Sequence, residues 1–299
     1  MSLLKIENVV KRFDALTTVD DVSFSLEAGQ RMALLGHNGA GKTTLMRMIL
    51  GLTAITSGHI EVLGAAPGNR KARRHTGYLP ESVAFHGSLS GREQLHHFAQ
   101  LKSVSIKVAD ELLERVGLNT AGDRRIRTYS KGMRQRIGLA QALIGQPKLV
   151  LLDEPTSGLD PVSRHEFYEI VHELAEAGAA VLLSSHALTE LETSTERIVI
   201  LSRGRLVANN DLASLRRDAH LPIRLKVTAT ANTADEIAEK LGAKRINCRA
   251  VELICRQEDK VALLGQISGL GNIVKDVDVI PVSLEELYRH YSAALPEDQ

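Results

Sequence analysis

Eight consecutive residues near the start of the chain have the types and the spacing needed to hold phosphate: Gly36, His37, Asn38, Gly39, Ala40, Gly41, Lys42 and Thr43. They match the pattern G-x-x-x-x-G-K-[ST]. Glycines let backbone N–H groups close around phosphate oxygens, and the N-terminus of a following helix adds positive potential. The Lys42 ammonium would balance phosphate charge, and the Thr43 hydroxyl would ligate Mg²⁺. The sequence therefore predicts a phosphate-binding loop; the alternative is a glycine-rich loop with an incidental lysine.

Two adjacent carboxylates, Asp153 and Glu154, follow the aliphatic run 149–152. A buried strand that ends in this way can deliver Asp153 to the Mg²⁺ shell, which leaves Glu154 to accept a proton from an attacking water. The alternative is a solvated acidic turn. The phosphate-binding loop upstream favours the catalytic interpretation.

Strands and helices alternate around these residues, which predicts an α/β fold. Strand 31–36 runs into the glycine-rich loop, and a helix begins at Lys42. The region from about 85 to 145 has helical spacing throughout and is expected to form a helical insertion. The other expected elements are strands 5–10, 22–26, 149–152 and 180–183 and a helix at about 162–177.

The pattern breaks around residues 210–222, where a charged stretch is followed by Leu221-Pro222. We therefore expect one domain over residues 1–212 and a second over 213–299. The second domain is expected to be a small α+β unit close to the split βαβ arrangement. Its expected elements are strands 223–228, 244–248, 251–255 and 274–280 and helices 233–241, 260–267 and 284–291.

Composition argues against several classes of protein. Aromatic residues make up only 3% with no Trp, so stacking platforms for single-stranded nucleic acid are poorly supplied. Lys and Arg (37) nearly balance Asp and Glu (36), whereas phosphate-backbone binders usually show a basic excess. We expect no nucleic-acid partner. No apolar run approaches the ~20 residues of a membrane span, and Lys5 and Glu7 interrupt any signal peptide, so a cytoplasmic location is expected.

Cysteines and histidines offer only weak metal signals. Cys248 and Cys255 lie on the apolar side of alternating strands, which favours packing in the core over a metal or redox role. His96 and His97 are adjacent and point to different faces of a helix. His165 and His172 lie seven apart without an evident third ligand. No metal site is expected at these residues.

A further motif, Tyr129-Ser130-Lys131-Gly132-Met133-Arg134-Gln135-Arg136, lies shortly before Asp153 at an expected helix start. A Ser hydroxyl, a Gly amide and a helix N-terminus together can hold a γ-phosphate presented from outside the subunit. With this motif, the chain resembles the ATP-binding-cassette (ABC) ATPases over residues 1 to about 212. The resemblance implies a P-loop NTPase fold in which a mixed sheet carries an antiparallel β subdomain and a helical insertion, with ATP and Mg²⁺ as cofactors.

The resemblance also implies roles for individual residues. Phe13 matches the aromatic residue that stacks on adenine, although it could also be a core residue. Ser157-Gly158-Leu159-Asp160 matches a loop that crosses to the partner subunit, and His186 matches the histidine that contacts the γ-phosphate and orders the water. Two positions depart from the family pattern. Lys131-Gly132-Met133 stands where the family has Gly-Gly-Gln, and Glu81 stands where it usually has a Gln that serves the nucleotide and Mg²⁺. The residues assigned to the nucleotide are Phe13, the loop 36–43, Thr44, Glu81, Ser130, Lys131, Gly132 and Asp160; Glu154 and His186 are assigned to catalysis, and Thr43, Asp153 and Glu81 to the metal.

The expected function is that of an ATP-hydrolysing transporter subunit. It would form a homodimer around two ATP molecules and energise a separate integral membrane subunit, with room for a periplasmic subunit, from the inner face of the membrane. The alternatives are a soluble ABC-type ATPase acting on nucleic acid or ribosomes, and a small-molecule phosphotransferase. The stretches 77–95 and 128–143 are similar to the NosF-type subunit, whose transporter supports maturation of the copper centres of nitrous oxide reductase. They suggest a copper or sulfur species as the cargo.

Overall fold

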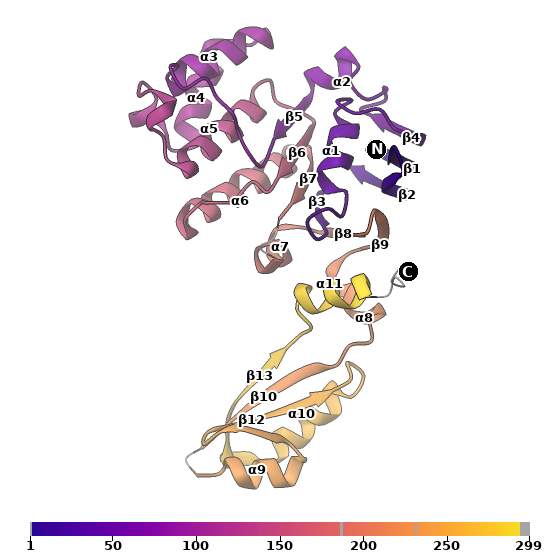
Figure 1. Ribbon diagram of the computed structural model, residues 1–299. Helices are drawn as coiled ribbons and strands as arrows, with labels where there is room; N and C mark the ends of the chain where they lie inside the picture. Colours follow the sequence, from indigo (N-terminus) through magenta and orange to yellow (C-terminus); the bar gives the residue numbers. More distant parts are fainter. Residues whose placement is uncertain (1, 186–187, 231, 294–299) are drawn as a thin grey trace. The chain divides into compact units, whose positions relative to one another are not determined.

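The computed structural model describes residues 2–185, 188–230 and 232–293. The chain divides into two compact units, Met1–Asp211 and Leu212–Ala293. The first unit contains a six-stranded and a three-stranded sheet, the second unit contains a four-stranded sheet, and each unit has its own buried cluster (Figure 1).

A six-stranded sheet forms the centre of the first unit, in the order β5-β6-β7-β3-β8-β9. Its first five strands are parallel, and β9 pairs antiparallel with β8. Every residue of β6 and β7 is buried, because both faces of the parallel sheet are covered by other elements. The strands are β3 (Arg31–Leu35), β5 (Thr76–Leu79), β6 (Leu149–Asp153), β7 (Ala180–Ser184), β8 (Arg197–Ser202) and β9 (Arg205–Asn210). The helices next to them are α1 (Lys42–Ile49), α2 (Arg70–Arg74), α6 (Pro161–Glu176) and α7 (Leu188–Ser194).

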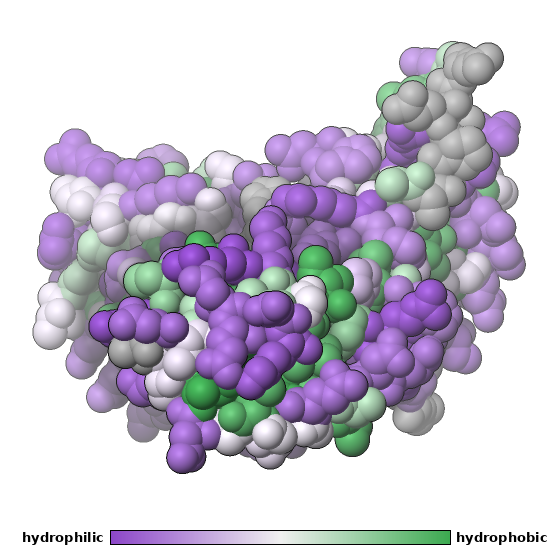
Figure 2. Space-filling view, turned by 90° about the horizontal axis from the view of Figure 1, so that it is seen from below, coloured by the Kyte–Doolittle hydropathy of each residue, from purple (hydrophilic) through white to green (hydrophobic). Residues whose placement is uncertain are grey.

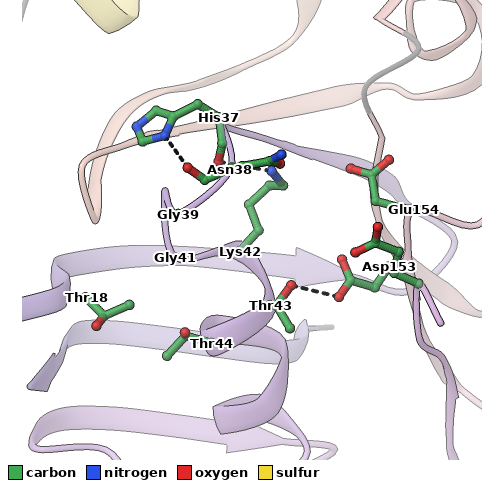
Figure 3. A pocket seen from close by; sticks show the side chains of 11 residues that line it. Thr18, His37, Asn38, Gly39, Gly41, Lys42, Thr43, Thr44, Asp153 and Glu154 are labelled. Atoms are coloured by element: carbon green, nitrogen blue, oxygen red, sulfur yellow. Dashed lines mark hydrogen bonds between the residues drawn. The ribbon is translucent and has the colours of Figure 1, made fainter. Parts of the chain in front are cut away.

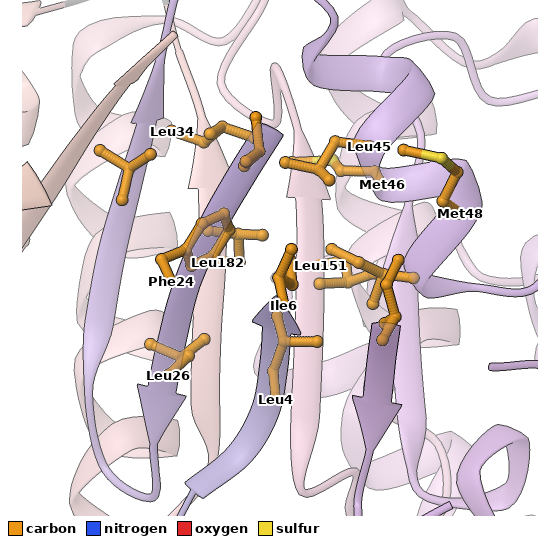
Figure 4. Packing of buried hydrophobic residues seen from close by; sticks show 14 of the residues in the cluster. Leu4, Ile6, Phe24, Leu26, Leu34, Leu45, Met46, Met48, Leu151 and Leu182 are labelled. Atoms are coloured by element: carbon orange, nitrogen blue, oxygen red, sulfur yellow. The ribbon is translucent and has the colours of Figure 1, made fainter. Parts of the chain in front are cut away.

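A three-stranded antiparallel sheet, in the order β2-β1-β4, joins the same unit. It consists of β1 (Ser2–Phe13), β2 (Leu16–Glu27) and β4 (Ser57–Val62). Its inward side chains and those of α1 pack on the parallel sheet in one aliphatic cluster (Figure 4). The labelled members of that cluster are Leu4, Ile6, Phe24, Leu26, Leu34, Leu45, Met46, Met48, Leu151 and Leu182. This cluster fixes the strand and the helix that flank the glycine-rich loop.

Three helices lie between β5 and β6: α3 (Gly91–Leu101), α4 (Ile106–Arg115) and α5 (Lys131–Leu143). Ser90 and Glu93 form a capping box at the start of α3, which satisfies two of its free N–H groups. Two short 3₁₀ turns, η1 (Asn119–Ala121) and η2 (Ile126–Thr128), lead into α5. The Tyr129 hydroxyl donates a hydrogen bond to the Ala121 carbonyl at 2.8 Å, and this bond fixes the approach to α5.

The second unit is an antiparallel sheet in the order β11-β12-β10-β13. Along β10, buried and half-buried side chains alternate, because one face of the strand packs on the unit's own core. Its elements are α8 (Leu212–Asp218), β10 (Ile223–Ala229), α9 (Ala234–Leu241), β11 (Lys244–Asn247), β12 (Ala250–Cys255), α10 (Lys260–Gly269), η3 (Gly271–Ile273), β13 (Val274–Ile280) and α11 (Leu284–Ala293).

The core packing predicted for the two cysteines is wrong for Cys248, which is exposed, while Cys255 is half-buried. The reason lies in the edge strand β11, all four residues of which are exposed. Cys248 follows the end of that strand. Alternation of apolar residues cannot distinguish an edge strand from a central one. Among the described residues, no three His, Cys, Asp or Glu side chains are grouped so that they could hold a metal ion.

Polar and hydrophobic side chains both lie on the surface. On the face seen from below in Figure 2, the hydrophobic side chains form small patches among polar ones. Within residues 2–185, 188–230 and 232–293, no helix has both the length and the apolar character needed to span a bilayer.

Candidate nucleotide-binding site

The glycine-rich loop connects the end of β3 to the start of α1. Gly41, which caps α1, has φ of +99°, and a Cβ atom there would lie 2.7 Å from the Thr18 carbonyl oxygen. Only glycine meets both conditions without strain. Gly39 also has positive φ, at +88°. The loop therefore turns tightly and leaves the first N–H groups of α1 available to an anion.

Lys42 is the first residue of α1 and is 7% exposed. Its ammonium donates hydrogen bonds to the carbonyl oxygens of Gly36 and, at 3.3 Å, of His37. Burial lowers the pKa of Lys42 below its ordinary value of 10.5, while the carboxylates of Glu154, Asp153 and Glu81 act in the opposite direction. A polyphosphate would give this desolvated cation the anionic partner that carbonyl dipoles replace only in part.

Asp153 is held from two sides at the end of β6. It is 2% exposed, and it accepts hydrogen bonds from the hydroxyls of Thr43 (2.9 Å) and Ser184 (2.7 Å). Asp153 and Ser184 are paired residues of the neighbouring strands β6 and β7. Hydroxyl and carboxylate oxygens are the ligands that Mg²⁺ prefers, so Thr43 and Asp153 fit a magnesium site.

Glu154, the next residue, is 6% exposed and adopts φ of +48°. A positive φ in a residue with a side chain is strained and persists only where the surroundings hold it. Here the Glu154 N–H donates to the Ser184 hydroxyl (3.0 Å) and carbonyl (3.2 Å), and its carbonyl accepts from the Ser157 N–H (3.2 Å). The backbone of this carboxylate is therefore fixed beside the Thr43–Asp153 pair.

These groups surround one cavity of about 270 Å³, shown in Figure 3. Lys42, Thr43, Asp153 and Glu154 lie around the same space, with the loop on one side and the end of β6 on the other. The residues that line it are Thr18, His37, Asn38, Gly39, Gly41, Lys42, Thr43, Thr44, Glu81, Asp153 and Glu154. Ten of these eleven are residues that the sequence analysis assigned to the site.

Sequence reasoning missed Thr18 and Ser184. Thr18 lies on β2, and its carbonyl oxygen is close to Gly41. Ser184 is the last residue of β7 and orients both Asp153 and Glu154. The sequence contains one signal for Ser184: it directly follows the aliphatic run 180–183, just as Asp153 directly follows the aliphatic run 149–152.

Other predicted residues do not line this cavity. Gly36 and Ala40 belong to the loop but pack behind it: Ala40 is fully buried, and a Cβ at Gly36 would lie 2.8 Å from the Leu201 carbonyl oxygen. Phe13 ends β1 and is 46% exposed, which excludes the core interpretation, and the Lys11 ammonium lies 4.4 Å from its ring centre. His186 lies outside the described residues.

The remaining predicted residues gather at two helix starts elsewhere in the first unit. Ser130 caps α5, where its hydroxyl accepts the Met133 N–H at 3.2 Å, and Lys131 and Gly132 begin that helix. Asp160 caps α6 and accepts the Val162 and Ser163 N–H groups. Hydrogen bonds from Ser163 lower the pKa of the Asp160 carboxyl. Ser130, Lys131 and Asp160 are exposed.

Comparison with known proteins places the fold and the family. The ABC transporter family model matches residues 19–157. YhcH of Bacillus subtilis (strain 168), an uncharacterized ABC transporter ATP-binding protein, is 34% identical over 301 residues, which cover 99% of this chain and 98% of that protein. The bacitracin transport ATP-binding protein BcrA of Bacillus licheniformis is 37% identical over 210 residues, 69% of each chain.

Solved structures agree. An ATP-binding subunit of an ABC transporter shares 32% identity with a TM-score of 0.68 and covers 72% of this chain and 92% of its own. A nucleotide-free ATP-binding cassette at 23% identity has the same fold with a TM-score of 0.64. The predicted mixed α/β fold of the ABC ATPases is thereby confirmed. With its glycine-rich loop, its Asp-Glu pair and a relative that matches almost its entire length, the chain belongs to the ABC transporter ATP-binding proteins and is an ATP-hydrolysing subunit of such a transporter.

Proposed function

We propose that two copies of this chain close around two Mg²⁺-ATP molecules and that this closure drives a separate membrane-spanning subunit. One observation supports the proposal above others. The groups suited to a polyphosphate fall into two sets, a buried set around Lys42 and an exposed set at the starts of α5 and α6, and the second set does not line the cavity of the first. A second copy could bring its exposed set to the γ-phosphate held by the first.

Each residue then has a distinct task. The loop 36–43, Thr44 and Lys42 hold the phosphates, and Thr43 and Asp153 hold Mg²⁺, which would stabilise the charge that develops on the phosphoryl group. Glu154 accepts the proton of the attacking water, and His186 orders that water. Phe13 stacks on adenine, and Glu81 takes a Mg²⁺-shell or water position. Ser130 and Gly132 bind the γ-phosphate of the partner's ATP, and Asp160 lies where the two chains meet.

The proposal also assigns different tasks to the two parts of the chain. Residues 1–212 carry every assigned nucleotide contact, and residues 213–299 act as an accessory domain. A partner spanning the membrane places the chain at the cytoplasmic face, where ATP is available, and a periplasmic subunit could join on the other side.

Export of a compound of the bacitracin or lantibiotic type is the cargo class that the relatives support. BcrA is described as a bacitracin transport protein, SrtF of Streptococcus pyogenes as a lantibiotic transport protein, and LnrL of Bacillus subtilis (strain 168) as a linearmycin resistance protein. A second candidate is maturation of the copper centres of nitrous oxide reductase, favoured by the similarity of stretches 77–95 and 128–143 to NosF-type subunits. Because the membrane partner selects the cargo, this chain supplies only the free energy of ATP binding and hydrolysis.

Dimer closure is tested with Gly132→Asp in the full-length chain. A Cβ at Gly132 meets nothing nearer than Leu159 at 3.4 Å, so the variant should fold, while its carboxylate repels the partner's γ-phosphate. Gly265→Asp is the matched control, since nothing lies within 4 Å of a Cβ there. Light scattering after size exclusion in ATP and Mg²⁺ should show dimers for the control and monomers for Gly132→Asp. Normal dimers of Gly132→Asp would refute the two-chain site.

The cargo is tested on the complex that the tagged chain retains from detergent-solubilised membranes. If a membrane-spanning protein co-purifies, the ATPase rate of the complex is measured with bacitracin and with Cu(I). Stimulation by the peptide supports the export proposal, and stimulation by Cu(I) alone supports the copper candidate. Retention of ribosomes in place of a membrane protein would contradict both.

A further inference from the structure

Lys131, the residue that departs from the glycine of the family pattern, crosses from the start of α5 to the loop that follows Glu154. Its ammonium donates a hydrogen bond to the Ser157 hydroxyl at 2.9 Å. Its methylene groups lie along Gly158, where a Cβ would stand 2.6 Å from Lys131 Cδ and 3.0 Å from Cε. Gly158, with φ of +86°, therefore leaves the space through which the lysine passes.

The loop that Lys131 contacts is a tight turn that begins at Glu154, the proposed general base. The Ser157 N–H donates to the Glu154 carbonyl at 3.2 Å, and the Leu159 N–H donates to the Thr156 carbonyl at 3.1 Å. Glu154 itself has the strained φ of +48°, so its position depends on the bonds that surround it. One backbone hydrogen bond therefore links Ser157 to Glu154.

We propose that Lys131 is a positioning residue that couples the two nucleotide sites to which one chain contributes. This inference rests on the proposed two-chain site, in which the start of α5 faces the partner's ATP while Glu154 faces the chain's own ATP. When the partner's γ-phosphate docks on Ser130 and Gly132, the Lys131–Ser157 bond carries the resulting shift of α5 to the turn at Glu154. A glycine at this position has no side chain with which to do so.

The hydrogen bond between Lys131 and Ser157 contributes little to the free energy of unfolding. Lys131 is exposed and Ser157 half-exposed, and polar contacts at such positions contribute little to folding because water competes for both partners. The turn is also held from its other end, since the Arg164 side chain donates to the Leu159 carbonyl at 3.0 Å and to Glu190 of α7 at 2.7 Å. Loss of Lys131 would therefore leave the turn folded and would remove its hydrogen bond to the start of α5.

The competing role for Lys131 is a direct contact with the partner's phosphate, and mixed dimers separate the two roles. In the first mixed dimer, one chain carries Lys131→Met and the other carries Glu154→Gln, so the only working base belongs to the chain that lacks the lysine. In the second, both substitutions lie in one chain, so the only working base belongs to the unmodified chain. Two affinity tags isolate each dimer, and Lys107→Met, which removes an exposed lysine on α4, replaces Lys131→Met in the matched control.

The first mixed dimer should hydrolyse ATP about fivefold more slowly than its control, with KM changed less than about twofold, and the second should match its control. In dimers without Glu154→Gln, Ser157→Ala should lower kcat as much as Lys131→Met, and the double variant should fall no further, because both remove one bond. Lys131→Arg, which retains a donor, should recover most of the rate.

Loss of rate in the second mixed dimer alone would overturn the proposal and make Lys131 a phosphate ligand. Equal rates in both dimers and their controls would also overturn it. The proposed two-chain site would still stand in that case, because the ATP-dependent dimers would have formed. If neither the control nor the variant chains form ATP-dependent dimers, the proposed two-chain site fails, and this inference falls with it.

Discussion

The two sets of phosphate-directed groups differ in how completely one chain satisfies them. Lys42, Asp153 and Glu154 are each less than 10% exposed. The Lys42 ammonium donates to carbonyl oxygens of its own loop, whereas Asp153 and Glu154 are held by hydrogen bonds with residues far away in the sequence. Ser130 and Asp160 are exposed, and among the described residues their side chains bond only within the first turn of their own helices. The buried set is preorganised by the sheet, which lowers the cost of forming the site. Under the proposed function, the exposed set would meet a phosphate only when a second copy covers it.

The largest effect should come from the base in the buried set. Glu154→Gln removes the proton acceptor and should lower the hydrolysis rate by about 10²–10⁴-fold. Affinity for Mg²⁺-ATP should persist, because Lys42, Thr43 and Asp153 are unchanged. Steady-state hydrolysis and ATP binding are measured on the same preparation, with Glu166→Gln, an exposed glutamate of α6, as the matched control. Hydrolysis at the original rate would show that the base lies elsewhere and would break the comparison.

Ser184→Ala tests how far the buried set depends on its neighbours. The change removes the hydroxyl that donates to Asp153 and accepts from the Glu154 N–H. A buried carboxylate that loses a donor costs about 1–3 kcal/mol, so both the free energy of unfolding and the rate should fall, the rate by about tenfold. Urea unfolding and ATPase assays are compared with Ser202→Ala, a buried serine at the end of β8. An effect no larger than that of the control would show that Asp153 is positioned without Ser184.

How much of this site could be foreseen depends on how local its signals are. The meeting of the loop 36–43 with the pair Asp153-Glu154 was predictable, because each is a local run of residues whose types indicate a phosphate or Mg²⁺ site. Ser184 and Thr18 were not, since they meet the site only through strand pairing and through the approach of β2 to the loop. The alternation of strands and helices likewise predicted the α/β fold, whereas Cys248 was misplaced because exposure at an edge strand follows from sheet order. The contact between Lys131 and Ser157 joins two motifs that the sequence shows only separately.

The third test uses pH, since burial sets the charge of Lys42. In the ligand-free fold, the lowered pKa lies below 10.5, and the phosphates of ATP should raise it again. Above the lowered pKa, ATP binding must therefore take up a proton, so affinity should fall as pH rises through that range, by at most about tenfold per pH unit. The unfolded chain holds more protons in the same window, so the ligand-free protein should gain stability there.

A fluorescent ATP analogue, titrated from neutral to alkaline pH, measures the first trend, and thermal unfolding measures the second. Lys42→Gln should bind more weakly and without this pH dependence. An affinity that stays constant up to pH 10.5 in the unmodified chain would mean that Lys42 remains fully charged, and the buried set would then be less desolvated than its exposure indicates.

The smallest effect is expected at Glu81, which shares one property with each of the two sets. It lines the cavity with the buried set, yet it is exposed like the residues at the starts of α5 and α6. Its carboxylate is the weakest of the three that act on Lys42. Water screens an exposed charge, so Glu81→Ala should change ATP affinity by less than about tenfold, ~1.4 kcal/mol.

The same residue follows the end of β5 and precedes α3, where a loop can respond to the nucleotide, so Glu81→Ala should lower the stimulation of ATPase rate by the membrane partner more than it lowers the basal rate. Glu81→Gln, which restores the family residue, serves as the matched variant without the charge. Binding is measured on the isolated chain and stimulation on the complex, so the two roles are read separately. An affinity loss beyond tenfold in Glu81→Ala would place this carboxylate in the buried set, and the division between a preorganised half and an exposed half would have to be redrawn around it.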